Sequence, residues 1–142
     1  CKYLNAPEKQ KEYVQNGWNI TGDIFKQDDE GYFYFVARGD DMIISSGYNI
    51  AAIEVENILL NHDNIKECAV VGLPNEDRGM VVCAYIVLFN STLDNDSYCV
   101  EIQDWFKQNA APYKYPRIIE FVKELPKTET GKIQRFKLKN KA

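Results

Sequence analysis

The sequence has few of the residues from which metal sites and redox sites are built. Its 142 residues include one histidine, His62, and four cysteines that form no Cys-x-x-Cys pair. Structural zinc sites use clusters of these two residue types at short spacing, so we expect no metal held by this chain. Cys68 and Cys83 lie in apolar runs, where a free cysteine usually packs as a small buried hydrophobe. We therefore expect reduced thiols in a cytoplasmic protein.

Long apolar runs, repeats and low-complexity segments are also missing. No apolar run reaches the roughly 20 residues that a membrane-spanning helix needs, so we expect no membrane span. The first residues, beginning with Cys1, contain neither an initiator methionine nor a signal peptide, and we expect a piece of a longer protein. With 45% hydrophobic and 13% aromatic residues, the chain can bury one ordinary core.

The net charge is low and unevenly placed. A value of −4 argues against non-specific binding to nucleic acid. Residues 123–142 carry seven Lys and Arg and two Glu, a net +5, which leaves −9 for the rest of the chain. We interpret Lys137, Lys139 and Lys141 as the solvated face of a final helix, and we reserve a phosphate-facing role for Lys132.

Hydrophobic periodicity predicts strands that alternate with amphipathic helices. Tyr98, Ile102 and Phe106 lie at helical spacing, which indicates a stripe that packs into a core. The predicted strands cover residues 18–26, 32–37, 65–73, 80–89 and 117–122, and the predicted helices cover 52–60, 97–108 and 133–139. This order favours an α+β fold, in which a small three-stranded sheet is flanked by two to three helices, with a further hairpin and a short N-terminal strand pair.

The aromatic run at residues 32–36, Tyr-Phe-Tyr-Phe-Val, allows two interpretations. Proteins that bind single-stranded nucleic acid stack bases on such side chains, but they combine them with a positively charged groove. No basic residue is interleaved with this run. We therefore predict a half-buried strand.

Three short motifs stand out, and the central one runs from Arg38 to Ile50. Asp40 and Asp41 are poor strand formers, so we expect the chain to change direction there, at a point we call the joint. A short apolar strand follows, and Ser45-Ser46-Gly47 can turn it back into a hairpin. The other two motifs are Gly17-Trp18-Asn19-Ile20-Thr21-Gly22-Asp23 and Pro126-Lys127-Thr128-Glu129-Thr130-Gly131-Lys132-Ile133.

In this order and at this spacing, the three motifs resemble those of the acyl-adenylate-forming superfamily. They are most similar to its acyl- and aryl-CoA ligases, of the medium-chain fatty acid and the benzoate or 2-aminobenzoate type. The resemblance implies that residues 1–39 are the tail end of a large N-terminal adenylation domain and include a β-hairpin. It implies that residues 40–142 form the mobile C-terminal domain. Ala37 replaces a glycine that is frequent in the family, and Gly39 stands at a position where the family varies.

The resemblance also implies an activity. Such ligases use ATP and Mg²⁺ to join a carboxylic acid to AMP, and they then pass the acyl group to the thiol of CoA. The C-terminal domain changes its pose between the two steps. The implied partners are the acid, ATP, CoA and the missing N-terminal domain of the same chain, with no nucleic acid. Because that domain would hold the ATP loop, we expect the isolated chain to be inactive.

Seven residues match functional positions of the family. Lys132 matches the lysine that catalyses adenylation, where an ammonium group can neutralise charge on the α-phosphate and the carboxylate. Asp23 and Arg38 match residues that contact the AMP ribose, for which a carboxylate is a suitable acceptor. Asp40 matches the hinge. The residues that match the pantetheine tunnel of CoA are Ser46, Gly47 and Tyr48.

Two other functions stay open, an adenylating domain that loads a carrier protein and a noncatalytic α/β binding module. Taken alone, Gly131-Lys132 is not a P-loop, because the glycine-rich run and the preceding strand are missing. Asp23 alone equally fits a turn residue after Gly22. The turn Ser-Ser-Gly-Tyr-Asn-Ile and the two acids of the joint favour CoA ligases, and the presence of both Lys132 and Asp23 favours an enzyme.

Overall fold

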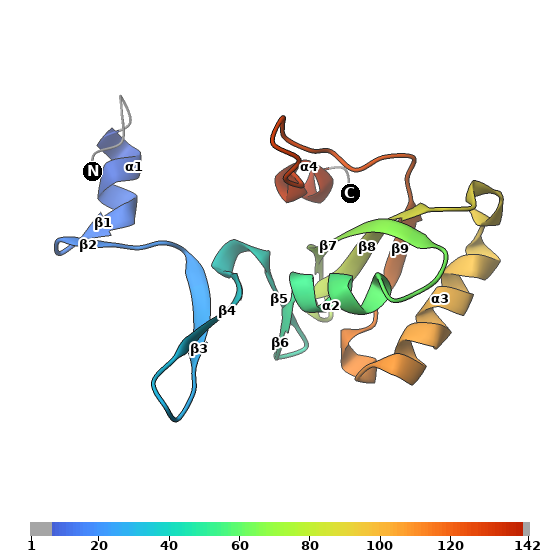
Figure 1. Ribbon diagram of the computed structural model, residues 1–142, viewed down its shortest axis with the longest axis horizontal. Helices are drawn as coiled ribbons and strands as arrows, with labels where there is room; N and C mark the ends of the chain where they lie inside the picture. Colours follow the sequence, from blue (N-terminus) through green and yellow to red (C-terminus); the bar gives the residue numbers. More distant parts are fainter. Residues whose placement is uncertain (1–6, 141–142) are drawn as a thin grey trace. The chain divides into compact units, whose positions relative to one another are not determined.

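The computed structural model describes residues 7–140, and the chain divides into two compact units, residues 1–40 and 41–142. The boundary falls between Asp40 and Asp41, the two acids of the joint. Figure 1 labels the helices and strands of both units.

The N-terminal unit consists of a short helix and two antiparallel hairpins. The β1–β2 hairpin has strands of only two residues, and the β3–β4 hairpin is longer and contains an irregularity between Ile24 and Phe25. In chain order, the elements are α1 (Pro7–Tyr13), β1 (Val14–Gln15), β2 (Trp18–Asn19), β3 (Asp23–Gln27) and β4 (Phe33–Arg38).

The predicted strand 18–26 is divided between these two hairpins, and the cause is the dipeptide Asn16-Gly17. Both residues have a positive φ, 52° and 83°, which is the backbone of a type I′ turn, a turn that Asn-Gly strongly favours. Trp18 therefore pairs backwards with Gln15, and β3 begins only at Asp23.

The aromatic run of β4 is exposed in this unit. Phe33 is 68% accessible and Phe35 is 52% accessible, and Phe35 packs edge to face with Phe25 on β3, at a ring-centroid distance of 5.9 Å. Burial begins only at Ala37, which is 3% accessible. The prediction of a half-buried strand is thus wrong for this part of the run, because the described residues supply no core against which these rings pack.

The C-terminal unit is built around one sheet, in which β8 (Gly79–Leu88) pairs with both β7 (Ile65–Asn75) and β9 (Ile118–Phe121). Strands β7 and β8 pair antiparallel, and β9 pairs parallel with β8. These are the three strands that the sequence predicts for this sheet.

The hairpin after the joint belongs to the same sheet. Its strands, β5 (Met42–Ser45) and β6 (Tyr48–Ala51), pair with one another, and Ser45 pairs with Gly79 at the start of β8. The predicted three-stranded sheet and separate hairpin therefore form one five-stranded sheet.

Three helices of the C-terminal unit agree with the predicted ranges, namely α2 (Ala52–Leu59), α3 (Asp96–Asn109) and α4 (Arg135–Lys139). Helix α3 starts at Asn95, whose side chain accepts a hydrogen bond from the Tyr98 amide at 3.0 Å and so satisfies one of the free donors of the first turn. Short 3₁₀ turns occupy η1 (Gly39–Asp41), η2 (Ser91–Leu93) and η3 (Pro112–Lys114).

The sheet is buried on both faces, which explains the nearly continuous apolar runs of β7 and β8. Alternate residues of the two strands point to opposite faces. One face packs against α2 and α3, and the other packs against α4 and the segment that leads to it (Figure 1). The side chains that cover the first face include Val55, Leu59, Ile102 and Phe106, and those that cover the second include Leu125 and Leu138.

The structure bears on the predictions about the cysteines and about membrane-spanning helices. Cys68 and Cys83 are buried, as predicted, and burial raises the pKa of each thiol to about 12, so both stay protonated and unreactive at neutral pH. Within residues 7–140, no helix is long and apolar enough to cross a membrane.

Candidate active site

Arg38 is the centre of a polar cluster at the end of the N-terminal unit. The register of the hairpin places Asp23 opposite Arg38, and the guanidinium Nη1 lies 3.1 Å from the Asp23 carboxylate. Nη1 also donates to the Thr21 carbonyl at 3.3 Å, and Nε donates to Asp40 at 3.2 Å. The structure thus brings together three of the predicted site residues, Asp23, Arg38 and Asp40.

Two glycines allow this cluster to form. The Gly39 amide donates to the Gly22 carbonyl at 2.7 Å, and a Cβ on Gly39 would lie 3.3 Å from that oxygen. Gly22 has a φ of 75°, and a Cβ there would lie 3.2 Å from a guanidinium nitrogen of Arg38. Larger residues would strain the backbone at Gly22 and crowd Arg38.

The glycine turn (residues 45–48) is a tight type I′ hairpin turn between β5 and β6. Ser46 and Gly47 have φ values of 49° and 82°, and Ser45 pairs with Tyr48 across the turn. No atom of the described residues lies within 4 Å of the position that a Cβ on Gly47 would take. The turn therefore leaves open space beside its backbone.

Two residues that the sequence did not single out hold the glycine turn in place. Arg78 donates to the Ser46 hydroxyl at 3.0 Å, and its carbonyl accepts from the Ser46 amide at 2.9 Å. Tyr113 stacks on Tyr48 with ring centroids 4.5 Å apart. Tyr48 remains half-exposed, so one face of the turn is packed and the other is accessible.

The lysine loop (residues 127–133) is closed by its own backbone. The Thr128 amide donates to the Lys132 carbonyl at 2.8 Å, and the Lys132 amide donates to the Thr128 hydroxyl at 3.1 Å. Gly131 takes a φ of 82°, the left-handed conformation that closes this turn. The loop is therefore a defined turn, although it is polar and exposed.

Lys132 is exposed on this turn, and its ammonium group contacts no carboxylate within residues 7–140. Other lysines of the unit have such partners: Lys127 pairs with Glu67 at 2.7 Å, and Lys114 pairs with Glu54. The ammonium of Lys132 is thus available to an anionic ligand, while its backbone is held in place.

Just beyond the lysine loop, Arg135 joins a buried cluster of charges. Its Nε and Nη2 donate to the Glu56 carboxylate at 2.8–3.2 Å, and its Nη1 lies 3.4 Å from Asp41. Glu56 is only 6% accessible and also accepts from the Val70 amide at 2.8 Å. Although burial lowers the pKa of Arg135, the neighbouring carboxylates raise it above its ordinary value, so the guanidinium stays charged.

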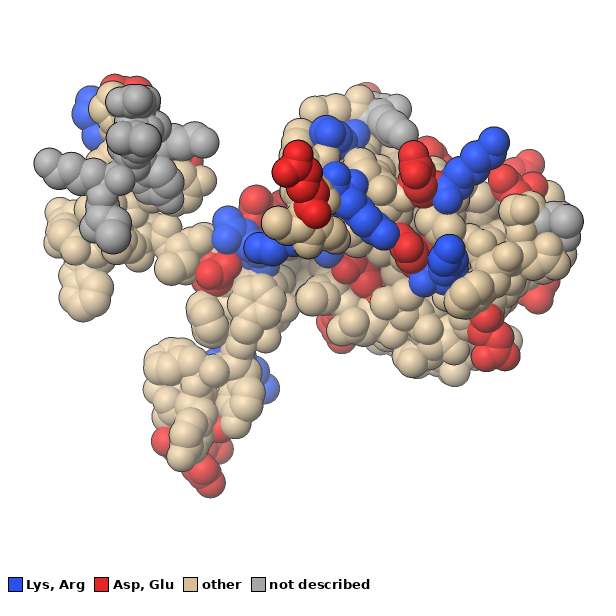
Figure 2. Space-filling model, turned by 45° about the horizontal axis from the view of Figure 1, so that its top comes forward, with Lys and Arg blue, Asp and Glu red and all other residues tan. Residues whose placement is uncertain are grey.

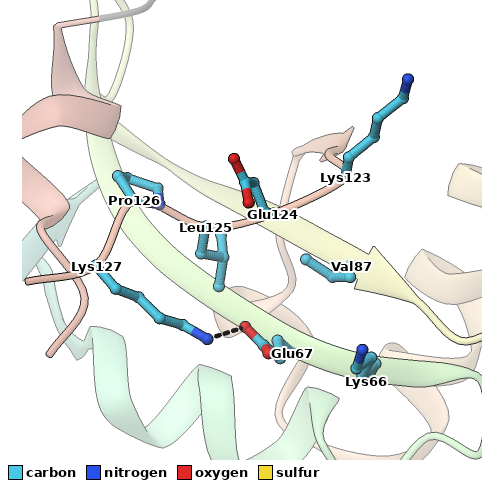
Figure 3. A pocket seen from close by; sticks show the side chains of 8 residues that line it. All are labelled: Lys66, Glu67, Val87, Lys123, Glu124, Leu125, Pro126 and Lys127. Atoms are coloured by element: carbon cyan, nitrogen blue, oxygen red, sulfur yellow. Dashed lines mark ion pairs between the residues drawn. The ribbon is translucent and has the colours of Figure 1, made fainter. Parts of the chain in front are cut away.

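An open hollow of about 590 Å³ lies at the other end of the lysine loop (Figure 3). Three lysines and two glutamates surround it, and the ion pair between Lys127 and Glu67 crosses its floor. The residues that line it are Lys66, Glu67, Val87, Lys123, Glu124, Leu125, Pro126 and Lys127. Because both charge signs alternate around the hollow, it does not form a basic pocket.

The lysine-rich C-terminal segment is less uniformly solvated than predicted. Lys137 is exposed, as expected, but Lys139 is half-buried with its ammonium 3.9 Å from Asp41. Lys141 lies outside the described residues. On the face of this unit that Figure 2 shows, acidic and basic side chains are interspersed.

These features define a small α+β domain that displays one unpaired lysine on a glycine-containing turn and begins at a charged joint. Residues 54–132, more than half of the chain, match the model of the AMP-binding enzyme C-terminal domain, and the chain belongs to that family.

Curated relatives match along almost the whole chain. The chain is 47% identical over 140 residues to an uncharacterised acyl-CoA ligase of Bacillus subtilis, which covers 99% of this chain and 26% of the relative. It is 49% identical over 142 residues to a mitochondrial acyl-coenzyme A synthetase of Rattus norvegicus, with 98% and 24% covered. The chain therefore spans about a quarter of the length of these relatives.

Solved structures of similar enzymes share the fold. An anthranilate CoA ligase in complex with anthranoyl-AMP matches with a TM-score of 0.84 and 40% identity, over 99% of this chain and 27% of that chain. The o-succinylbenzoate CoA synthetase of Bacillus subtilis, in complex with its acyl-adenylate intermediate, matches with a TM-score of 0.83 and 36% identity, over 97% and 28%.

Proposed function

We propose that this chain is the C-terminal portion of an ATP-dependent acid:CoA ligase. In the first step, a carboxylate oxygen attacks the α-phosphorus of ATP, and the bond to the β-phosphate breaks to release pyrophosphate. In the second step, the CoA thiol displaces AMP from the acyl-adenylate and forms a thioester. Residues 1–39 would be the tail end of the large adenylation domain, and residues 40–142 would be the mobile domain.

The observation that carries this proposal is the lysine loop of a member of the AMP-binding C-terminal domain family. Its backbone is fixed by internal hydrogen bonds, and the Lys132 ammonium has no carboxylate partner within residues 7–140. A preorganised cation of this kind stabilises charge that develops on phosphate oxygens. We assign to Lys132 the neutralisation of charge between the carboxylate and the α-phosphate in the first step.

The Arg38 cluster suits a site for the AMP ribose. Asp23 offers carboxylate oxygens as acceptors for ribose hydroxyls, and Arg38 offers several donors in a fixed fork. The arginine is 46% accessible in its side chain, so a ligand can reach it. We assign ribose binding to Asp23 and Arg38, and we assign the hinge between the two poses to Asp40.

The glycine turn suits the passage of the pantetheine arm of CoA. Gly47 adds no side chain at the tip, and open space lies where its Cβ would be. Ser46 is fixed by Arg78, and Tyr48 is fixed by Tyr113, so the turn keeps a defined wall. We assign this wall of the tunnel to Ser46, Gly47 and Tyr48.

The proposed substrates rest on the motif resemblance and on the acyl-adenylate complexes of similar enzymes. A medium-chain or aromatic acid is the proposed acyl donor, and Mg²⁺ would accompany ATP. Within residues 7–140, no three His, Cys, Asp or Glu residues group as metal ligands, so no residue of this chain is assigned to the metal. We propose a cytoplasmic enzyme, although several relatives are named as mitochondrial. A carrier-protein acceptor in place of CoA is the second candidate.

ATP–pyrophosphate exchange tests the proposal with two proteins. The full-length protein should catalyse exchange that depends on an added medium-chain or aromatic acid, and it should then consume CoA in place of a phosphopantetheinyl carrier protein. The isolated 142-residue chain should fold, because it has its own core, but it should show no exchange. Robust exchange by the isolated chain, or none by the full-length protein with any acid of the panel, would contradict the proposal.

A further inference from the structure

We propose that Arg135 is a positioning residue for Lys132, which holds the lysine loop at a fixed place relative to the joint. The inference rests on the proposed role of Lys132 in adenylation. It assigns to Arg135 no contact with a substrate. Arg135 would act only by fixing the backbone from which Lys132 extends.

The two ends of the lysine loop lie next to each other. Lys127 and Ile133 form a β-bridge, and the Gln134 amide donates to the Pro126 carbonyl at 2.8 Å. Because this base is closed, the loop behaves as one short hairpin. Whatever fixes its two ends therefore sets the position of Lys132, which directly precedes the bridging residue Ile133.

An ion pair holds each end of the hairpin, but the two pairs differ in burial. At the first end, Lys127 and Glu67 are 41% and 34% accessible in their side chains. At the second end, Arg135 and Glu56 are 23% and 8% accessible. Exposed pairs contribute little and exchange readily with water, whereas a buried, bidentate pair defines one geometry. Arg135 is thus the stronger of the two anchors.

The partners of Arg135 are themselves fixed points of the unit. Glu56 lies on α2 and is held in the core by the Val70 amide. Asp41 is the first residue of the C-terminal unit. Arg135 therefore connects three segments that are distant in sequence, namely the start of the unit, helix α2 and the lysine loop. A rotation at the joint would carry the lysine loop with it through this contact.

The alternative is that Arg135 only stabilises the fold. In that case, its substitution would lower both half-reactions together, in proportion to the folded fraction. A positioning role affects adenylation alone, because only that step uses Lys132. The two roles therefore differ in which half-reaction responds, and they also differ in whether the effect requires Lys132.

Arg135→Lys in the full-length enzyme is the first test. Lysine keeps the charge but cannot present the planar fork to Glu56, so the loop should shift without loss of the cation. A shift of a catalytic group by about 1 Å lowers a rate by about tenfold to 10²-fold. We expect that loss in acid-dependent pyrophosphate exchange, while thioester formation from supplied acyl-adenylate and CoA is unchanged. The melting temperature of each variant reports its folded fraction.

The same substitution in a Lys132→Ala background decides between the two roles. If Arg135 acts through Lys132, Arg135→Lys should cause no further loss of exchange there. A further loss of the same factor, or an equal fall in both half-reactions, would overturn the inference and leave the proposed function intact. If Lys132→Ala alone leaves exchange unchanged, the proposed function fails, and the inference fails with it.

Two more variants complete the experiment. Glu67→Gln breaks the exposed ion pair at the other end of the loop, and it should leave exchange within about twofold of the parent, as exposed pairs contribute little. Should Arg135→Lys fail to fold, Asp41→Asn carries the same test, because it weakens the 3.4 Å contact with Arg135 and the 3.9 Å contact with Lys139 but leaves the bonds from Arg135 to Glu56 in place. It should lower exchange selectively and only in the presence of Lys132, and loss in both half-reactions would overturn the inference.

Discussion

Two arginines bond the two acids of the joint, but they do so in different surroundings. Arg38 pairs with Asp40, the last residue of the N-terminal unit, and Arg135 pairs with Asp41, the first residue of the C-terminal unit. The Arg38 side chain is 46% accessible, and the Arg135 side chain is 23% accessible. The same pairing of a guanidinium with two carboxylates thus occurs once in contact with water and once within the packed domain.

The difference in burial indicates different functions. Arg38 can exchange a carboxylate for a ligand, because water compensates for the bond that is lost. Arg135 cannot exchange its carboxylate in this way, because breaking the ion pair would leave Glu56 charged and buried without a partner. We therefore interpret the exposed cluster as a binding site and the buried cluster as an anchor.

The largest effect should be on stability. We expect Arg135→Met to lower the free energy of unfolding of the C-terminal unit by about 3–5 kcal/mol, since removing one partner of a buried pair strands the other. Arg38→Met should lower stability by no more than about 1 kcal/mol, since its pairs are exposed.

Tryptophan fluorescence during urea unfolding measures both variants. Trp105 lies on α3, so a Trp18→Phe background reports the C-terminal unit and Arg135→Met. Trp18 lies in the N-terminal unit, so a Trp105→Phe background reports Arg38→Met. Equal losses for the two arginines would remove the distinction between anchor and binding site. Combining Arg135→Met with Glu56→Met should recover part of the loss, because the stranded carboxylate is then gone.

The next effect should be on the two half-reactions of the full-length enzyme. Lys132→Ala should slow adenylation by about 10²–10³, the usual loss for one preorganised electrostatic contact. Thioester formation from supplied acyl-adenylate and CoA should stay within several-fold of the parent, because Lys132 would lie far from the reacting atoms in the second pose. Pyrophosphate exchange and CoA consumption measure the two steps separately.

Arg38→Ala sharpens this prediction. A ribose contact serves the nucleotide in both steps, so we expect Arg38→Ala to weaken both half-reactions, and Lys132→Ala to weaken only one. If Lys132→Ala lowered both equally, Lys132 would hold structure or bind nucleotide throughout, and the two-pose mechanism would have to be abandoned.

A smaller effect should follow from fixing the joint. Proline at position 40 holds φ near about −65°, so Asp40→Pro should trap the domain near one pose. We expect one half-reaction to fall about tenfold or more relative to the other, as for other displaced catalytic groups. Asp40→Ala also loses the contact with Arg38 but keeps a mobile backbone, and it is the matched control. Equal, small losses for Asp40→Pro in both steps would show that Asp40 is not the hinge.

Periodicity predicted most of the C-terminal unit, because its strands and helices are long and amphipathic. The ranges of α2, α3, β7 and β8 agree with the predicted ones to within two residues. Periodicity predicts the N-terminal unit less well, because its strands are short and its aromatic residues are exposed. The residues of its turns decide its structure, and Asn16-Gly17 is the local signal for the turn between β1 and β2.

The Arg135 anchor was not predicted, because its residues are far apart in the sequence. Glu56 lies in the range 52–60 predicted as a helix, close enough to its start to suit the helix dipole, and Arg135 is one of the seven cations of residues 123–142. One local signal was present: Glu56 shares the buried stripe of α2 with Ala52, Val55 and Leu59. A charged residue on such a stripe indicates a buried partner, but nothing local identifies that partner as a residue 79 positions away.

The smallest effect should come from the acids of the joint themselves. Asp41 lies 3.4 Å from Arg135, a longer contact than the 2.8 Å bond from Arg135 to Glu56. Asp41→Asn should therefore lower stability by only about 1 kcal/mol, because Arg135 keeps its bonds to Glu56 and asparagine still offers an oxygen acceptor. Asp40→Asn should lower it by no more than an exposed ion pair contributes, about 0.2–1 kcal/mol. Urea unfolding measures Asp41→Asn in the Trp18→Phe background and Asp40→Asn in the Trp105→Phe background. If Asp41→Asn lowered stability as much as Arg135→Met, then Asp41, and not Glu56, would fix Arg135. The anchor would then lie at the joint itself, where rotation of the domain would strain it, and the C-terminal unit could no longer move as one rigid body with its lysine loop.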